Sequence, residues 1–168
     1  MNEEEIEGGS EVDPDYEDYS KALRGEPIMA LLRVHLLTEY YLERIIHLQL
    51  ARGDKLIESG NFSYSQKLSL VSAMNVLPDD LLSCLKNLNK VRNKCSHEKD
   101  YQPTFADVEL IGRPLGKNYT KLRRERPHTV ENMLGYVVGH ICAGITAIIS
   151  YQEELLTIDS TENKTDFD

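Results

Sequence analysis

A long segment without helix breakers is the feature that most constrains the fold of this chain. Between Pro27 and Arg52 the sequence contains no internal Gly or Pro, the two residues that interrupt helices most readily. Pro27 suits the first turn of a helix, and Gly53 suits the stop after it. Because the apolar residues of this segment occupy more than one stripe, we predict a central helix that is contacted on several sides.

Two further helices are indicated by similar patterns. Ser63 or Ser65 can cap a helix within 62–77. Pro78 begins another, whose apolar residues recur every third or fourth position until about Cys95. Since strand-like alternation is absent, we predict an all-α fold, an up-and-down bundle of four to five helices with disordered acidic termini.

The last helix is expected to run from near Thr129 to near Leu156. Small residues recur in it at every fourth position, a spacing that would let another helix approach closely: Gly135, Gly139, Ala143 and Ala147. Its apolar run, 134–149, is shorter than the roughly 20 residues that a membrane span needs, and it contains His140. We therefore expect a core or dimer helix and no membrane partner.

The net charge of −9 is distributed unevenly. Residues 1–18 carry nine acids and no base, and residues 153–168 carry six acids and one lysine. The middle, 19–152, therefore holds 28 − 15 = 13 acids and 19 − 1 = 18 bases, a net charge of +5. We predict a disordered acidic N-terminal arm (1–18), a helical domain (19–157) and a disordered acidic tail (158–168).

The cysteines favour a reducing compartment. Cys84, Cys95 and Cys142 match neither a disulfide framework nor paired metal-ligand spacing. With no signal-like run at the N-terminus, this pattern favours a cytoplasmic protein. The sequence contains no Gly-rich phosphate loop and no HExxH motif, and we expect no cofactor.

The segment Val91–His97, VRNKCSH, carries the side chains best suited to catalysis. Arg92 and His97 would point about 140° apart on a continuous helix, so they converge only if the helix ends or frays near Ser96. Asn93 and His97 share a face. Histidine transfers protons near neutral pH, and arginine offers a permanent charge to a phosphate. These groups suit metal-independent cleavage of RNA by attack of its 2′-hydroxyl.

In this helical setting, Arg92-Asn93-x-x-x-His97 resembles the R-x(4–6)-H motif of HEPN domains. The preceding helices, LLRVHLLTEYYLERI and FSYSQKLSLV, are similar to bacterial members, so the resemblance covers roughly residues 28–98. It implies Arg92 and His97 as catalytic residues, Asn93 as a supporting one, and a homodimer that joins two motifs in one cleft. It also implies an RNA-cleaving toxin or phage-defence effector, with a cognate antitoxin or other protein partner.

Two alternatives stay open for this segment. Arg and His near a helix C-terminus also interact favourably with the helix dipole, so both could be ordinary capping residues. The family includes members without nuclease activity, and a non-catalytic interaction module that assembles with a protein partner is the alternative function.

A polar stripe on the first long helix is expected to support the motif. His35, Glu39, Glu43 and His47 are each four residues apart. We predict that Glu39, with Glu43, pairs with Arg92 or His97 from the neighbouring helix. A carboxylate metal site and solvent-facing pairs are the alternatives. We expect no metal, because di-iron sites use Glu-x-x-His whereas this stripe has Glu43-x-x-x-His47, and no second such motif appears.

Basic residues gather in 99–127, after one short helix that Thr104 would cap. This segment is interpreted either as a solvated loop or as a phosphate-contacting surface. The residues predicted to bind nucleic acid are Lys94, Lys117, Lys121, Arg123, Arg124 and Arg126.

Overall fold

The computed structural model describes residues 26–125 and 129–165, with side chains as far as Ile158. Within these residues the chain is helical and contains no strand, which confirms the predicted all-α class. The elements, in chain order, are α2 (Pro27–Gln49), α3 (Gly53–Ser59), α4 (Tyr64–Met74), α5 (Asp79–His97), α6 (Phe105–Gly112), the 3₁₀ helix η1 (Arg113–Leu115), α7 (Lys117–Glu125) and α8 (Val130–Thr165). The predicted acidic arm, 1–18, and Arg126 lie outside the described residues.

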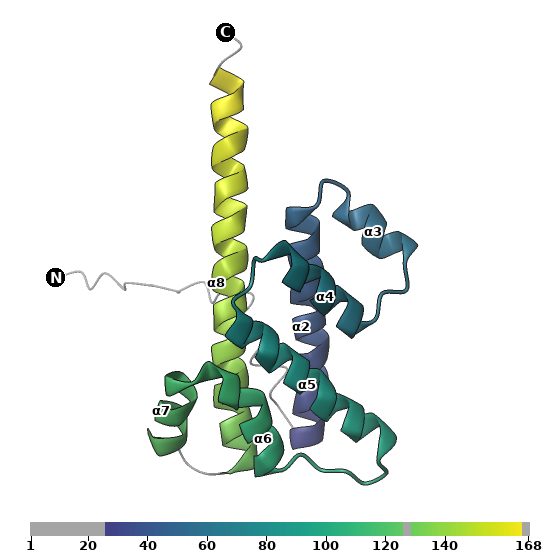
Figure 1. Ribbon diagram of the computed structural model, residues 1–168, viewed down its shortest axis with the longest axis vertical. Helices are drawn as coiled ribbons and strands as arrows, with labels where there is room; N and C mark the ends of the chain where they lie inside the picture. Colours follow the sequence, from purple (N-terminus) through teal and green to yellow (C-terminus); the bar gives the residue numbers. More distant parts are fainter. Residues whose placement is uncertain (1–25, 126–128, 166–168) are drawn as a thin grey trace, which may run out of the picture.

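The longer helices α2, α4, α5 and α8 form the bundle, and the short ones cover its ends. Helices α2 and α8 lie side by side and run in the same direction (Figure 1). The guanidinium of Arg44 in α2 donates two hydrogen bonds of 3.0 Å to the carboxylate of Glu153 in α8. Helices α6 and α7 gather at the end of the molecule where α2 and α8 begin (Figure 1).

Helix α2 is the central helix that the sequence predicts. It contacts α3, α4, α5 and α8. Its buried apolar side chains form a wide stripe of Ala30, Leu31, Val34, Tyr41, Leu42, Ile45 and Ile46. Each fully buried Leu or Ile stabilises the fold by about 1.5–3 kcal/mol relative to an exposed one, so this stripe anchors the bundle.

The connection after α2 differs from the prediction. Helix α2 ends at Gln49 because Leu50 is extended, with φ −116° and ψ 125°. Gly53 is not a stop but begins α3, where the sequence indicated only turns. A Cβ at Gly53 would lie 2.5 Å from the carbonyl oxygen of Ile46, so the absence of a side chain lets α3 fold back closely on α2.

Two predicted caps are present. Ser63, rather than Ser65, caps α4: its hydroxyl accepts from the Gln66 amide, and the Gln66 side chain accepts from the Ser63 amide at 2.8 Å. Thr104 caps α6 with the same reciprocal pattern. Both caps satisfy backbone donors at a helix start and so fix where the following helix begins.

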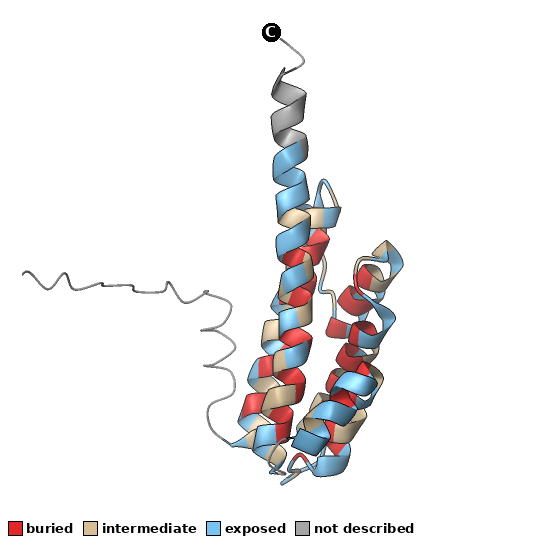
Figure 2. Cartoon of the chain, turned by 90° about the vertical axis from the view of Figure 1, so that its left-hand side faces the viewer, coloured by how far each residue is buried: buried red, intermediate tan, exposed pale blue. Residues whose placement is uncertain are grey.

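Helix α8 is longer than the sequence predicts. It was expected to end near Leu156, before a disordered tail at 158–168, but it continues through Thr165. Residues 157–165 contain no Gly or Pro, so nothing interrupts the helix there. The final part described with side chains projects beyond the other helices and is exposed (Figure 2).

One side of α8 is buried and the other is open. The segment Val130–Ile158 is long and apolar enough to cross a membrane, and it also packs against α2, α6 and α7. Of the predicted small-residue series, Ala143 and Ala147 are exposed. The described bundle therefore leaves that side of α8 without cover.

Candidate functional site

Helix α5 keeps Arg92 and His97 apart within one chain. Helix α5 is continuous through His97, slightly beyond the predicted end near Cys95, so the end or fraying near Ser96 that would let the two side chains converge is not present. The Glu98 amide still donates to the Lys94 carbonyl at 2.9 Å, and the Ser96 hydroxyl donates to the Arg92 carbonyl at 3.2 Å. The two side chains therefore point about 140° apart, as on any regular helix.

Arg92 is half-buried and faces a pocket of 310 Å³. Its Nη1 donates to Asn93 Oδ1 at 3.2 Å, and among the described residues no carboxylate lies within ion-pair distance of its guanidinium. We call this hollow the α5 pocket; it is lined by His35, Glu39, Ser63, Tyr64, Ser65, Asn89, Arg92 and Asn93. His97 is exposed and does not line it.

A hydrogen-bonded chain across three helices shapes the α5 pocket. His35 Nε2 donates to Asn89 Oδ1 at 3.0 Å, and Asn89 Nδ2 donates to Ser65 Oγ at 3.0 Å. The His35 ring stacks on Tyr64 with 4.1 Å between centroids. Burial, together with the nearby Arg92, holds the pKa of His35 below its ordinary value, so this imidazole is neutral at pH 7. Neither Asn89 nor Ser65 was predicted from the sequence to belong to the site.

The predicted partner of the acidic stripe is wrong. Glu39 and Glu43 do not pair with Arg92 or His97, because Lys67 of α4 takes both carboxylates, at 2.6 and 2.5 Å. The Lys67 side chain is only 9% exposed. Burial alone would lower the pKa of Lys67, but the hydrogen bonds to Glu39 and Glu43 raise it above its ordinary value. A sequence signal existed, since Lys67 occupies an apolar position in the series Tyr64, Lys67, Leu68 and Val71.

The alternative metal interpretation of that stripe finds no geometric support in the part of the chain that the structure describes. His35 is hydrogen-bonded to Asn89, the two carboxylates bind Lys67, and His47 is exposed. No group of three or more His, Cys, Asp or Glu side chains among these residues is arranged to hold a metal ion.

Lys94, a predicted nucleic-acid contact, is engaged within the fold. Its Nζ lies 3.3 Å from Asp107 Oδ1 and 6.0 Å from the ring centre of Tyr101. Asp107 is buried and also accepts hydrogen bonds from the Tyr101 hydroxyl at 2.6 Å and from Thr104. Burial alone would raise the pKa of Asp107, but the hydrogen bonds from Tyr101 and Thr104, with the one from Lys94, hold it below its ordinary value. This cluster ties the segment after the motif to α6.

The basic segment folds as a helix rather than as a solvated loop. Within α7, Lys117, Lys121 and Arg124 are spaced three and four apart and are exposed, so they share an outward face. Arg123 lies on the opposite side with Tyr119, and its Nη1 donates to Glu109 Oε1 of α6 at 3.2 Å. The predicted bases that lie in α7 therefore divide into an outward face and Arg123, which turns toward α6 although its side chain is still 61% exposed.

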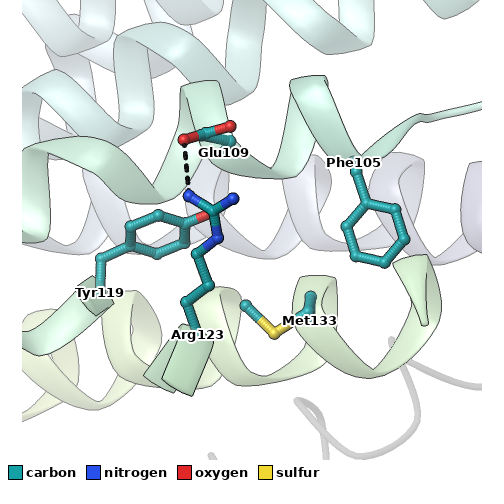
Figure 3. Close-up of a pocket in the computed structure, with 5 residues that line it drawn as sticks. All are labelled: Phe105, Glu109, Tyr119, Arg123 and Met133. Atoms are coloured by element: carbon teal, nitrogen blue, oxygen red, sulfur yellow. Dashed lines mark hydrogen bonds and ion pairs between the residues drawn. The ribbon is translucent and has the colours of Figure 1, made fainter. Parts of the chain in front are cut away.

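Arg123 borders a second hollow, between α6, α7 and α8 (Figure 3). Its first lobe, of 320 Å³, is lined by Phe105, Glu109, Tyr119, Arg123 and Met133. An adjoining lobe of 280 Å³ shares three of these residues and adds Arg113, Gly116 and Thr120. We call the two lobes together the α7 pocket, which was not predicted from the sequence.

Comparisons with known proteins add no assignment. No protein-family model matches the chain, and neither the curated proteins nor the solved structures give a match. The HEPN resemblance therefore remains a prediction that rests on the α5 motif and its helical setting.

Proposed function

We propose that this protein is a metal-independent endoribonuclease of HEPN type that acts as a homodimer, in a toxin or phage-defence role. One observation carries the proposal: Arg92 is half-buried, borders the α5 pocket, and has no carboxylate partner among the described residues. A guanidinium held in this way is suited to an anionic ligand, because two of its edges can donate to phosphate oxygens. Asn93, beside it, supplies a further amide.

The electrostatics of the α5 pocket are compatible with a phosphate. Glu39 lines the pocket, and Lys67, which it shares with Glu43, offsets part of its charge at 2.6 Å. The neighbouring His35 is neutral, so it adds neither attraction nor repulsion at pH 7. Arg92 is thus a cation of the α5 pocket whose charge is not paired with a carboxylate of the described residues, so it can bind an anionic ligand.

The proton-transfer group has to come from a second copy of the chain. Because α5 is continuous, His97 points away from the Arg92 of its own chain. In the proposed dimer, Arg92 of one copy holds the phosphate while the exposed His97 of the partner accepts the proton of the 2′-hydroxyl. The 2′-oxygen then bonds to phosphorus, the bond to the 5′-oxygen breaks, and the 5′-oxygen takes a proton from the imidazolium that this same His97 has become. The products are a 2′,3′-cyclic phosphate and a 5′-hydroxyl.

Cleavage of single-stranded RNA in the presence of a chelator tests this function. The wild-type chain should cut RNA and leave DNA of the same sequence intact. General acid–base groups contribute about 10²–10⁴-fold, so His97→Ala should slow cutting at least about 100-fold. His47→Ala, which removes an exposed histidine of α2, is the matched control and should keep full activity. Unchanged cleavage by both Arg92→Ala and His97→Ala would rule the proposal out.

A second function is favoured by the exposed apolar surface of α8. Large apolar side chains on its projecting part are exposed: Tyr151, Leu155, Leu156 and Ile158. Such a surface suits a non-catalytic module that assembles with a protein partner. A chain that cuts no RNA but forms a stoichiometric complex with another chain through α8 would favour this alternative.

A further inference from the structure

The α7 pocket combines an apolar floor with a basic rim. Tyr119 and Met133 are buried in its floor, whereas the ring of Phe105 stands at its wall and is 46% exposed. Arg123 lies at the centre, paired with Glu109 (Figure 3). Of the neighbouring exposed bases, Arg113 lines the second lobe, whereas Lys117, Lys121 and Arg124 lie next to the pocket on the outward face of α7; we call these four the basic rim. A ligand that fits this surface has to bring both negative charge and large apolar groups.

We propose that the acidic N-terminal segment of this same chain, residues 3–19, binds the α7 pocket and its basic rim. Residues 1–18 carry nine acids and no base, which complements the rim. The segment also interleaves its acids with apolar and aromatic residues, and its last part reads Asp15-Tyr16-Glu17-Asp18-Tyr19. Tyr16 and Tyr19 supply rings for the apolar floor, while the carboxylates between them reach the rim.

The connection between this segment and the described fold is short. Helix α2 begins at Pro27, at the same end of the molecule that carries α6 and α7 (Figure 1). Fully extended, the intervening residues 20–26 span about 25 Å, and seventeen further residues lie beyond them. The segment can therefore reach the pocket and is long enough to cover it.

The covalent link also favours this occupant over a free ligand. A tethered segment experiences an effective concentration on the order of millimolar, so even a weak contact is populated within one molecule. A free anion of similar affinity binds the rim only when its concentration exceeds this effective concentration. The proposal goes beyond the nuclease function and does not depend on it, but it adds a consequence: the segment competes with RNA for the outward face of α7.

Zero-length cross-linking of the full chain tests the contact without RNA. A carbodiimide joins carboxylates to lysine amines, and peptide mapping of the monomeric product identifies the pairs. We expect links from residues 3–18 to Lys117 and Lys121, at yields severalfold above those to Lys55, an exposed lysine of α3. Raising the salt from about 0.1 to about 1 M shortens the Debye length from about 10 to 3 Å and should remove the excess.

Variants of the pocket separate this contact from nonspecific attraction. Arg123→Gln combined with Phe105→Ser should lower the links to Lys117 and Lys121 severalfold, whereas Arg52→Gln, at an exposed position before α3, should not. Unfolding curves of each variant show whether the fold is retained. Equal yields at Lys55 and at the α7 lysines would overturn the proposal. Links found only in covalent dimers would overturn it as well, because the occupant would then be the segment of a second copy.

The competition with RNA has its own readout. A full chain with all nine acids of residues 1–18 changed to Gln or Asn should bind a single-stranded RNA oligonucleotide more tightly at about 0.1 M salt. An unchanged affinity would contradict the competition. A loss of nuclease activity in Arg92→Ala bears on the proposed function alone, since the cross-links do not involve the α5 pocket.

Discussion

Replacing Lys67 with Met should destabilise the fold far more than the same change at an exposed lysine. The side chain of Lys67 is 9% exposed, and its two partners, Glu39 and Glu43, are 25% and 30% exposed. Removing one partner of a fully buried ion pair costs about 3–5 kcal/mol, because the remaining charge stays buried. Since water reaches a quarter to a third of each carboxylate, we expect a loss of about 2–3 kcal/mol in the free energy of unfolding.

Urea unfolding at pH 7, followed by circular dichroism, measures this loss. The pKa of Lys67 is raised, so its contribution is fully present below the ordinary lysine pKa and is lost only as the pH rises through the folded value. The midpoint should fall by about 1 M urea with an unchanged slope. Lys55→Met is the matched control, because Lys55 is 59% exposed and its pairs with Asp54 and Glu58 lie at the surface. It should cost no more than about 0.5 kcal/mol.

A rescue experiment separates lost charge pairing from lost packing. In a background of Glu39→Gln and Glu43→Gln no carboxylate is left unpaired, so Lys67→Met should cost less than about 1 kcal/mol there. Equal effects of Lys67→Met and Lys55→Met, or an equal cost of Lys67→Met in both backgrounds, would refute the reasoning.

Further predictions concern Asp107 and Gly112. Asp107→Asn should lower the free energy of unfolding by about 1–3 kcal/mol at pH 7, whereas Asp54→Asn, at an exposed position, should change little. Because the folded pKa of Asp107 is depressed, its contribution to stability is present above the ordinary Asp pKa and is lost as the pH falls through the folded value. The cost of Asp107→Asn should therefore shrink over that pH range. A cost that does not change with pH would contradict this. Gly112→Ala should cost about 1–3 kcal/mol in the free energy of unfolding, because its Cβ would lie 2.5 Å from the Tyr119 ring. Thermal unfolding measures this cost, and an unchanged melting temperature would show that the ring moves freely.

Local signals in the sequence predict much of this fold. Pro27, Ser63 and Thr104 act within one turn of their own positions, so the starts of α2, α4 and α6 can be recognised without knowledge of the tertiary structure. Helix α7 could not be recognised in the same way. Its inward side is narrow, with Tyr119 buried among charged neighbours, so its sequence resembles that of a basic loop.

The sequence pointed to Arg92, Asn93 and Glu39 of the α5 pocket, but not to the other residues that line it or to its geometry. The motif Arg92–His97 could be found from residue types and spacing alone, whereas the direction of each side chain depended on whether α5 ended before His97. The partner of Glu39 and Glu43 depended on which helix packs beside α2. That choice is tertiary, and it brings Lys67 rather than Arg92 to the carboxylates.

The most direct test of the central claim is cleavage by a mixture of two inactive variants. If Arg92 of one copy acts with His97 of the other, Arg92→Ala and His97→Ala chains refolded together should form mixed dimers with one intact pair. With half of the dimers mixed and one of two symmetric pairs intact in each, cleavage should return to about a quarter of the wild-type rate. A mixture that forms such dimers but stays as inactive as either variant alone would contradict the account.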